Sequence, residues 1–425
     1  MGLASLTLSH KKNTKDNPTA EFALPSEIVL PLSQTIGAPC EPIVQKGDLV
    51  KTGQKVGDSK AAMSAPIHSS ISGEVTEIFD FLNPDGRYCK ALRIKSDGED
   101  TRIDFTPPEI DDRQSFIYAV RESGLSGLGG ASFPTHIKLA YDPIKNPIDT
   151  LVINGAECEP HITSDYRCFM EDSADIIEGI LLVMKHMGIP HCVIGIENNK
   201  PEAIKIMNEK TRDLPAVKVL SLAALYPQGA EKVIVHSATG RIIGEGQLPA
   251  DQNVMVLNVT TCAFIAKYIR TGIPLITKRI TLDGTSITKN AGNYNVRIGT
   301  PIQNLLDFAG VEKVNTLLYG GPMMGISLYD TTQPILKNTN AVLAFAEDIS
   351  APEPTACIRC GFCMTACPLN LMPMHLARAY QNKDKEDLKK LKLNLCMNCG
   401  CCSYVCPAKR PLAEYNQLAK AMLRG

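Results

Sequence analysis

The sequence has no tryptophan, no apolar run of membrane-spanning length and almost no net charge. Its longest apolar stretches, such as residues 176–187, are interrupted by charged residues, so none of them forms the roughly 18-residue uncharged segment of a transmembrane helix. Lys and Arg number 44 against 45 Asp and Glu, which gives a formal charge of −1. A chain without excess positive charge lacks the field that attracts nucleic acid, which is therefore not expected as a partner.

The 15 cysteines are the feature that the sequence has in excess, and they are unevenly placed. Nine fall within residues 357–406 and six within the 356 residues before. The first 15 residues lack the basic start and apolar stretch of a secretory signal, so we expect a reducing cytosol. Clustered thiols in that compartment indicate metal ligands or redox groups rather than disulfides.

One cysteine pattern, Cys-x2-Cys-x2-Cys-x3-Cys-Pro, occurs twice near the C-terminal end. It is typical of bacterial two-cluster ferredoxins, in which the fourth cysteine of each run ligates the other cluster. We therefore predict two [4Fe–4S] clusters, one held by Cys357, Cys360, Cys363 and Cys406 and the other by Cys396, Cys399, Cys402 and Cys367. The alternative is a pair of zinc sites, but zinc ribbons pair two Cys-x2-Cys knuckles rather than two complete runs. Cys401 is predicted to be a non-ligating ninth thiol.

Residues 28–94 consist of short apolar runs separated by Gly and Pro, which predicts a small β-barrel or sandwich. The stretch 46–54 resembles the turn, strand and turn of lipoyl and biotinyl carrier domains, and Lys60 stands near the position of their modified lysine. Two interpretations follow: an acylated Lys60, or a sandwich that shares only the fold and leaves Lys60 as a solvated turn residue, which we favour. Residues 1–25 are predicted to be irregular.

Helical and strand patterns alternate after residue 107, which predicts an α/β domain with a largely parallel sheet. Strand, helix and strand patterns beyond it fit a small α+β module of β-grasp (SLBB-like) type, and residues 350–354 have the composition of a linker. Helical spacing between the two cysteine runs predicts a helical tail. The expected domains are 1–106, 107–250, 251–349 and 350–425.

Two loops carry the residue types of a cofactor site. Residues 124–135 place several glycines between two predicted helices, where backbone N–H groups can approach a phosphate or a flavin ring and the next helix adds its positive N-terminus. A helix precedes the loop, so it is not the dinucleotide fingerprint. Residues 154–160 follow a buried strand, and in parallel sheets ligands bind at the carboxyl ends of strands.

At these loops, GLGGASFPTHIK and INGAECEP, the sequence resembles the FMN- and NADH-binding loops of the flavoprotein component of respiratory complex I. The domain order resembles that of the RnfC family, a component of the ion-translocating NAD:ferredoxin oxidoreductases known as Rnf complexes. The resemblance runs from about Lys12 to Pro407. It implies a multidomain α/β fold: a lipoyl-like β-sandwich, an α/β FMN-binding domain, a β-grasp (SLBB-like) module and a helical two-[4Fe–4S] ferredoxin domain.

The resemblance also implies which residues contact the cofactors. The implied FMN contacts are Gly127, Gly129, Gly130, Lys138, Asn154, Glu157, Gly229, Glu231, Asn258 and Thr261, while Phe133 and Glu159 are implied to face NADH. Three features depart from the complex I flavoprotein: Ala156 replaces an aspartate, residues 246–252 lack a lysine that helps to hold NADH, and the tail has two cysteine runs instead of one.

Other interpretations of three of these residues stay open. The alternative interpretation of Lys138 is a solvated charge on a helix. Phe133 is alternatively a packed core residue, and Glu231 is alternatively a surface carboxylate. The histidines at 68, 136 and 161 show no metal-ligand spacing, so we predict that they are turn or surface residues.

Flavin and clusters in one chain imply that the flavin converts between two-electron and one-electron transfer. The resemblance implies a peripheral protein on the cytoplasmic face of the membrane, exchanging electrons between NADH and ferredoxin-side carriers through FMN. Integral membrane and iron–sulfur partner subunits would couple this flow to Na⁺ or H⁺ translocation. One alternative is a soluble flavin and iron–sulfur relay feeding a partner reductase, such as proline reductase. Another is a cluster-bearing scaffold with a vestigial flavin site.

Overall fold

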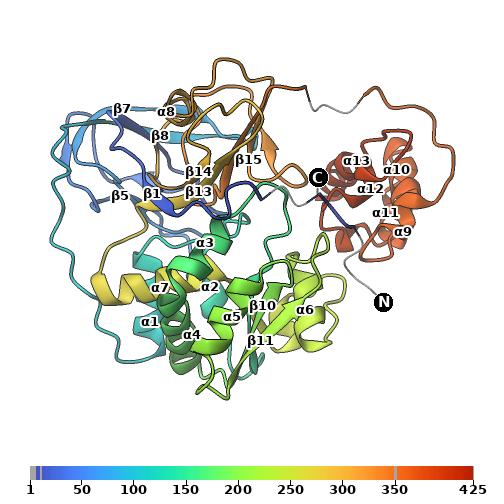
Figure 1. The fold of residues 1–425 in the computed structure, drawn as a ribbon, viewed down its shortest axis with the longest axis horizontal. Helices are drawn as coiled ribbons and strands as arrows, with labels where there is room; N and C mark the ends of the chain where they lie inside the picture. Colours follow the sequence, from blue (N-terminus) through green and yellow to red (C-terminus); the bar gives the residue numbers. More distant parts are fainter. Residues whose placement is uncertain (1–5, 10–11, 349–351, 425) are drawn as a thin grey trace.

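The computed structural model describes residues 6–9, 12–348 and 352–424 of the chain, so the first residues of the predicted linker at 350–354 lie outside the described residues. In Figure 1 the blue N-terminal barrel lies beside a gold and orange sheet, the green α/β part lies beneath them, and the red helical tail lies to one side. The mixed, multidomain α/β architecture expected from the sequence is confirmed.

Two small antiparallel sheets form the N-terminal barrel. Their order is β2-β8-β7-β4 and β3-β5-β6, with the strands β2 (Glu27–Pro31), β3 (Glu41–Pro42), β4 (Leu49–Val50), β5 (Lys55–Asp58), β6 (Ile67–His68), β7 (Gly73–Leu82) and β8 (Tyr88–Ser96). Ile28, Val56 and Leu92 are fully buried between the sheets, as the short apolar runs predicted. Lys60 is exposed in the loop after β5.

A four-stranded parallel sheet forms the centre of the α/β part. Its order is β11-β10-β9-β12, with β9 (Thr150–Gly155), β10 (His191–Glu197), β11 (Val217–Leu222) and β12 (Val254–Asn258). Leu151 and Ile153 pack with the helices on one face, and Val152 packs with α6 (Glu231–Thr239) on the other. Burial on both faces explains why these strands are almost continuously apolar.

The helices around this sheet follow local capping signals where the sequence contains them. They are α1 (Arg113–Glu122), α2 (Thr135–Leu139), α3 (Ser164–Glu171), α4 (Ser173–Met187), α5 (Pro201–Lys210), α6 and α7 (Val259–Thr271). Asp112 and Ser115 form a capping box at the start of α1, and α4 ends at Gly188, whose φ of +68° suits glycine. Neither α3 nor α6 was predicted.

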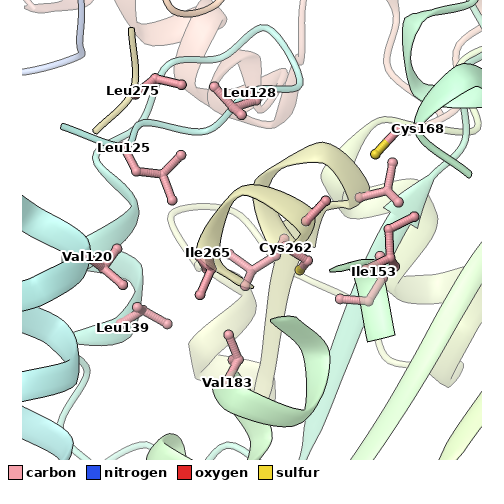
Figure 2. Close-up of a cluster of buried hydrophobic side chains, with 14 of the residues drawn as sticks. Val120, Leu125, Leu128, Leu139, Ile153, Cys168, Val183, Cys262, Ile265 and Leu275 are labelled. Atoms are coloured by element: carbon pink, nitrogen blue, oxygen red, sulfur yellow. The ribbon is translucent and has the colours of Figure 1, made fainter. Parts of the chain in front are cut away.

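The pairing of the parallel sheet contradicts the predicted domain boundary at residue 250. β12 pairs with β9, so the strand assigned to the next module completes the parallel sheet, and α7 packs against α4. Figure 2 shows part of the core that results, in which Leu125 and Leu128 of the glycine-rich loop belong to the same buried cluster as Ile265 of α7. The partner of a strand can lie a hundred residues away, which no local pattern reveals.

A six-stranded mixed sheet follows, in the order β1-β14-β13-β17-β15-β16. Its strands are β1 (Thr19–Glu21), β13 (Thr277–Asp283), β14 (Gly292–Arg297), β15 (Thr316–Tyr319), β16 (Ile326–Ser327) and β17 (Ala341–Phe345), and α8 (Ile302–Phe308) covers its core. The prediction of an irregular start to the chain was wrong for β1, which pairs in parallel with β14.

The histidine prediction was wrong for His68 and His136, which are buried in β6 and α2, whereas His161 lies in a turn, as predicted, although it is buried too. His68 and His136 are about one-twentieth exposed, and Nδ1 of His161 lies 2.7 Å from Oδ2 of Asp283. Burial lowers the pKa of His68 to about 3, so this ring is neutral at physiological pH.

The C-terminal part is helical, as predicted. It contains α9 (Phe362–Thr365), α10 (Pro373–Gln381), α11 (Lys385–Lys390), α12 (Cys401–Tyr404) and α13 (Leu412–Arg424). Gly361 and Gly400 occupy equivalent places in the two cysteine runs and have φ of +81° and +77°. Each initiates a short helix, so the sequence repeat is also a backbone repeat.

Candidate functional site

The parallel sheet reverses its strand order beside β9. The chain moves from β9 to β10 and β11 on one side, then returns to place β12 on the other side of β9. Asn154 and Asn258 are register partners at the carboxyl ends of these two adjacent strands. Ligands of open parallel sheets bind outside the carboxyl ends at such a reversal. The fold therefore forms a candidate crevice where the two asparagines lie.

The glycine-rich loop lies against this crevice. The N–H of Leu128 donates to Oγ1 of Thr261, with an N–O distance of 3.0 Å, and a Cβ on Gly129 would lie 3.1 Å from Nδ2 of Asn258. Asn258 caps α7 by accepting hydrogen bonds from the backbone N–H groups of residues 260 and 261. The long helix whose N-terminus meets the loop is thus α7, whereas the predicted helix after the loop is the five-residue α2.

The tip of the loop has room and donors for a cofactor. Gly127 donates its N–H to the Phe133 carbonyl, 2.8 Å away, which closes the loop. Gly130 has a φ of +108°, and a Cβ there would meet no atom of the described residues within 4 Å. Within the described ranges, the N–H groups of Gly129 and Gly130 have no hydrogen-bond partner. Exposed donors beside open space fit a phosphate or flavin group, so this loop suits the predicted FMN.

Lys138 of α2 reaches across the same crevice. Its Nζ lies 2.7 Å from Oε1 of Glu231, the first residue of α6, and 3.2 Å from the Val256 carbonyl. It also lies 5.9 Å from the centre of the Phe133 ring. The structure thus brings Lys138, Glu231 and Phe133 together, and both charged groups are only partly exposed. Lys138 is paired, which disfavours its interpretation as a freely solvated charge.

Asn154 ties β9 to the loop before α6. Its Nδ2 donates to the Gly229 carbonyl, 2.8 Å away, and its Oδ1 accepts from the Ala156 N–H. A Cβ on Gly229 would lie 2.5 Å from the Ala156 carbonyl oxygen, so only glycine allows the two loops to approach this closely. Asn154 and Gly229 therefore form one wall of the crevice.

The carboxylate of Glu157 is directed into the protein. Its Oε1 accepts from the Asp165 N–H at 2.7 Å, and its Oε2 accepts from the Tyr166 N–H at 3.4 Å, so it stabilises the free N-terminus of α3. Burial raises the pKa of Glu157 to about 7, and the nearby Lys12 opposes this shift. The carboxylate implied to contact FMN is thus occupied by backbone N–H groups of α3 in this structure.

The carboxylate of Glu159 is held by a different element. It accepts the backbone N–H groups of Met323 and Met324, at 3.0 and 2.9 Å, from the turn between β15 and β16. A Cβ on Gly321 would lie 2.2 Å from its Oε2, so the turn can approach only because residue 321 is glycine. Burial raises the pKa of Glu159 to about 7. The residue implied to face NADH is already hydrogen-bonded here.

Asp165 and Lys278 support the crevice and were missed in the sequence. Asp165 accepts from Nδ2 of Asn258, 2.8 Å away, and from the hydroxyl of Thr260. Lys278 donates to the Leu128 carbonyl at 2.8 Å, and burial lowers its pKa to about 8. Strand alternation offered a signal, because Lys278 shares the buried face of β13 with Ile280.

Two further lysines hold the site loops, Lys337 fully buried and Lys12 half-buried, and neither belongs to a recognisable sequence motif. Nζ of Lys12 donates to the carbonyls of Glu157, Glu159 and Ile162. Nζ of Lys337 donates to the carbonyls of Pro66 and Gly124, which joins the barrel to the start of the glycine-rich loop. Burial lowers the pKa of both lysines.

The eight predicted cluster cysteines line two separate cavities in the tail. One cavity is lined by Cys357, Cys360, Cys363 and Cys406, and the other by Cys367, Cys396, Cys399 and Cys402. The fourth cysteine of each run thus joins the first three of the other run, in the arrangement predicted for cluster ligands. Cys401 also borders the second cavity and belongs to the same buried cluster as Cys158, which lies in the loop at residues 154–160, here called the acidic loop. The first cysteine group is the set of cysteines that lines the first cavity, and the second cysteine group is the set that lines the second cavity.

Comparisons with known proteins match three parts of the chain. The RnfC barrel sandwich hybrid domain matches residues 6–99, the Nuo51 FMN-binding domain matches residues 120–267, and the 4Fe-4S dicluster domain matches residues 356–409. The second match includes β12 and most of α7, in agreement with the sheet that these elements complete.

Curated relatives match along most of their length. The C subunit of the proton-translocating ferredoxin:NAD(+) oxidoreductase complex of Clostridium ljungdahlii is 40% identical over 86% of this chain and 81% of its own. The Na(+)-translocating counterpart of Acetobacterium woodii is 38% identical over 87% and 85%. An air-oxidized NAD+-reducing [NiFe]-hydrogenase chain shares the fold, with a TM-score of 0.50 and 16% identity over 73% of this chain and 63% of its own.

Proposed function

Because this chain belongs to the RnfC family, the C subunits of ion-translocating ferredoxin:NAD(+) oxidoreductase complexes, we propose that it exchanges electrons between NAD(H) and the iron–sulfur carriers of partner subunits. Its cofactors are FMN and two [4Fe–4S] clusters. The observation that carries the proposal is the open glycine cradle at the reversal of strand order, in one chain with two four-cysteine cavities. When bound, the flavin supplies the change between two-electron and one-electron transfer.

The residues at the crevice have separate roles in holding FMN. The exposed N–H groups of Gly129 and Gly130 donate to the cofactor, and Lys138 contributes positive charge balanced by Glu231. Asn258 and Thr261 hold the glycine-rich loop against the N-terminus of α7, whose dipole favours an anionic ligand. Glu157, Asn154 and Gly229 set the position of the neighbouring loops.

Phe133 and Glu159 form the proposed NADH side of the site. Phe133 is half-buried beside Lys138 and offers a ring for stacking. The Glu159 carboxylate exchanges its two backbone N–H partners for hydroxyl groups of the dinucleotide, as acidic residues do in other NAD sites. Because these partners belong to the turn at 320–325, dinucleotide binding displaces that turn.

The first cysteine group is the proposed contact with an outside electron carrier. Cys357 and Cys360 are exposed, and Ile358, Arg359 and Arg410 line the same cavity. Residues 350–425 contain eleven Lys and Arg against five Asp and Glu, although the whole chain is nearly neutral. Two arginines beside an exposed cluster, in a part of the chain with excess positive charge, suit an acidic carrier of ferredoxin type.

We assign attachment to the membrane and ion coupling to partner subunits. No helix within the described residues is both long enough and apolar enough to cross a bilayer. The relatives are named as subunits of proton- and Na(+)-translocating complexes, and we propose that this chain is a peripheral member of such an assembly on the cytoplasmic face.

Anaerobic purification of the native protein from its own cells tests this proposal. The expected result is co-purification with integral membrane subunits, about one FMN per chain and about eight iron atoms. Mixing with NADH then bleaches the flavin. A protein that carries FMN and iron but never accompanies membranes would be a soluble relay, and a protein without flavin would be a cluster scaffold; either result rejects the proposal.

A further inference from the structure

A buried junction connects the crevice loops to the second cysteine group. Its apolar members are Leu8, Cys158, Tyr226, Ala366, Cys399 and Cys401, which come from the N-terminal segment, two loops of the crevice and both cysteine runs. Segments more than 150 residues apart in the sequence thus share one small core. The red tail lies beside the green α/β part in Figure 1, and this core is where they meet.

Tyr226 is the central residue of this junction. Its hydroxyl donates to the Cys399 carbonyl, with an O–O distance of 2.6 Å, and its side chain is only 1% exposed. Its backbone pairs in both directions with Leu6, at 2.8 and 3.1 Å. Three residues later, Gly229 accepts the hydrogen bond from Asn154 in the crevice. One short loop therefore contacts the crevice at one end and a cysteine of the second group at the other.

A second contact supports the same segment of the tail. The carbonyl of Met323 would lie 3.0 Å from a Cβ on Gly400, and the Met323 N–H binds Glu159 of the acidic loop. Residues 399–401 are thus enclosed between Tyr226 and Met323. The first group is different, because Cys357 and Cys360 are exposed. The second group is the one that packs against the flavin-binding part.

We propose that Tyr226 is a positioning residue that holds the second cysteine group close to the flavin crevice for electron transfer, an inference that rests on the proposed function. The step that it serves moves one electron from reduced flavin to the cluster of the second group, so the flavin loses one electron and the cluster gains it. Tunnelling rates fall steeply with distance, so a hydrogen bond that fixes the backbone of Cys399 affects this step. Hydrogen bonds near a cluster also influence its potential.

The variant Tyr226→Phe tests the inference because it keeps the ring and removes only the hydroxyl. The full chain, loaded with FMN and both clusters, is mixed anaerobically with NADH while flavin and cluster absorbance are followed separately. Bleaching of the flavin by NADH keeps its rate. Reduction of the clusters slows by about fivefold to tenfold. This is the factor by which loss of one buried hydrogen bond weakens the packing of the second cysteine group against the flavin-binding part.

Tyr294→Phe is the matched control. Tyr294 is also buried, and its hydroxyl donates to the Asn290 carbonyl at 2.8 Å, but it lies in β14 and outside the junction. This control keeps both rates. Equal slowing in the two variants, or wild-type rates for both steps in Tyr226→Phe, would overturn the proposal.

Two readouts remain informative if NADH reduces no flavin, which would reject the proposed function alone. In dithionite-reduced protein, the paramagnetic signal of one cluster shifts in Tyr226→Phe and stays unchanged in Tyr294→Phe. Amide hydrogen exchange at residues 399–401 increases only in Tyr226→Phe. An unchanged signal together with unchanged exchange would show that Tyr226 does not position the second group.

Discussion

Gly130 offers the sharpest test of where the flavin lies. Its φ of +108° is unfavourable for any residue with a Cβ, yet a Cβ would meet no atom within 4 Å in the part of the chain that the structure describes. Gly130→Ala therefore has two separable effects: backbone strain of about 1–2 kcal/mol and an added methyl group in the space assigned to the cofactor. Gly188→Ala is the matched control, because Gly188 has a φ of +68° and also has open space around it, but it ends α4 far from the crevice.

Both variants are expected to lose about 1–2 kcal/mol of unfolding free energy as apoproteins, measured by denaturant melts. Only Gly130→Ala is expected to lose FMN affinity, by at least about tenfold or 1.4 kcal/mol, measured by quenching of flavin fluorescence. Unchanged FMN affinity in Gly130→Ala would refute the placement of the flavin. Equal losses of affinity in both variants would show that strain alone is responsible.

Three other predictions follow from buried charges and from the cysteine groups. The Glu159 carboxyl has a pKa of about 7 in the folded protein against an ordinary 4.5. Its contribution to stability, about 2–3 kcal/mol, is therefore fully present below pH 4.5 and is lost as the pH rises through 7. Denaturant melts at pH 5 and pH 8 should show a smaller loss of unfolding free energy between the two pH values in Glu159→Gln than in wild type. Lys337→Met leaves two buried carbonyls unpaired, so calorimetry should show a destabilisation of about 2–3 kcal/mol, and equal melting temperatures would contradict this. Cys402→Ser should retain about half of the iron, whereas Cys401→Ser retains nearly all of it; equal iron contents would contradict the ligand assignment.

Much of the fold follows from local patterns in the sequence. The ranges of α4 and α5 agree with prediction because the residues that begin and end these helices, and their apolar spacing, can be recognised locally in the sequence. β12 was assigned to the wrong part, since its partner β9 lies about a hundred residues earlier. β1 was missed because a three-residue edge strand carries almost no periodic signal.

The site was predictable in its loops but not in the direction of its side chains. Glu157 and Glu159 are two residues apart, yet one carboxylate caps α3 and the other binds the turn after β15. Only tertiary contacts decide between these directions. Lys12 and Lys337 were not predicted as site residues for the same reason, because the sequence around a single lysine gives no indication of the distant carbonyl groups that its ammonium will bind. The role of Tyr226 depends on a cysteine 173 residues away.

Electron transfer from NADH through the flavin to the clusters can be followed by anaerobic titration of the holoprotein with NADH, with flavin absorbance and the paramagnetic signals of the clusters recorded in the same sample. NADH is expected to bleach the flavin, and cluster signals are expected to appear in the same titration, because both cofactor sites belong to one connected chain. A flavin that stays oxidised under NADH, in protein whose clusters dithionite reduces normally, would contradict this expectation.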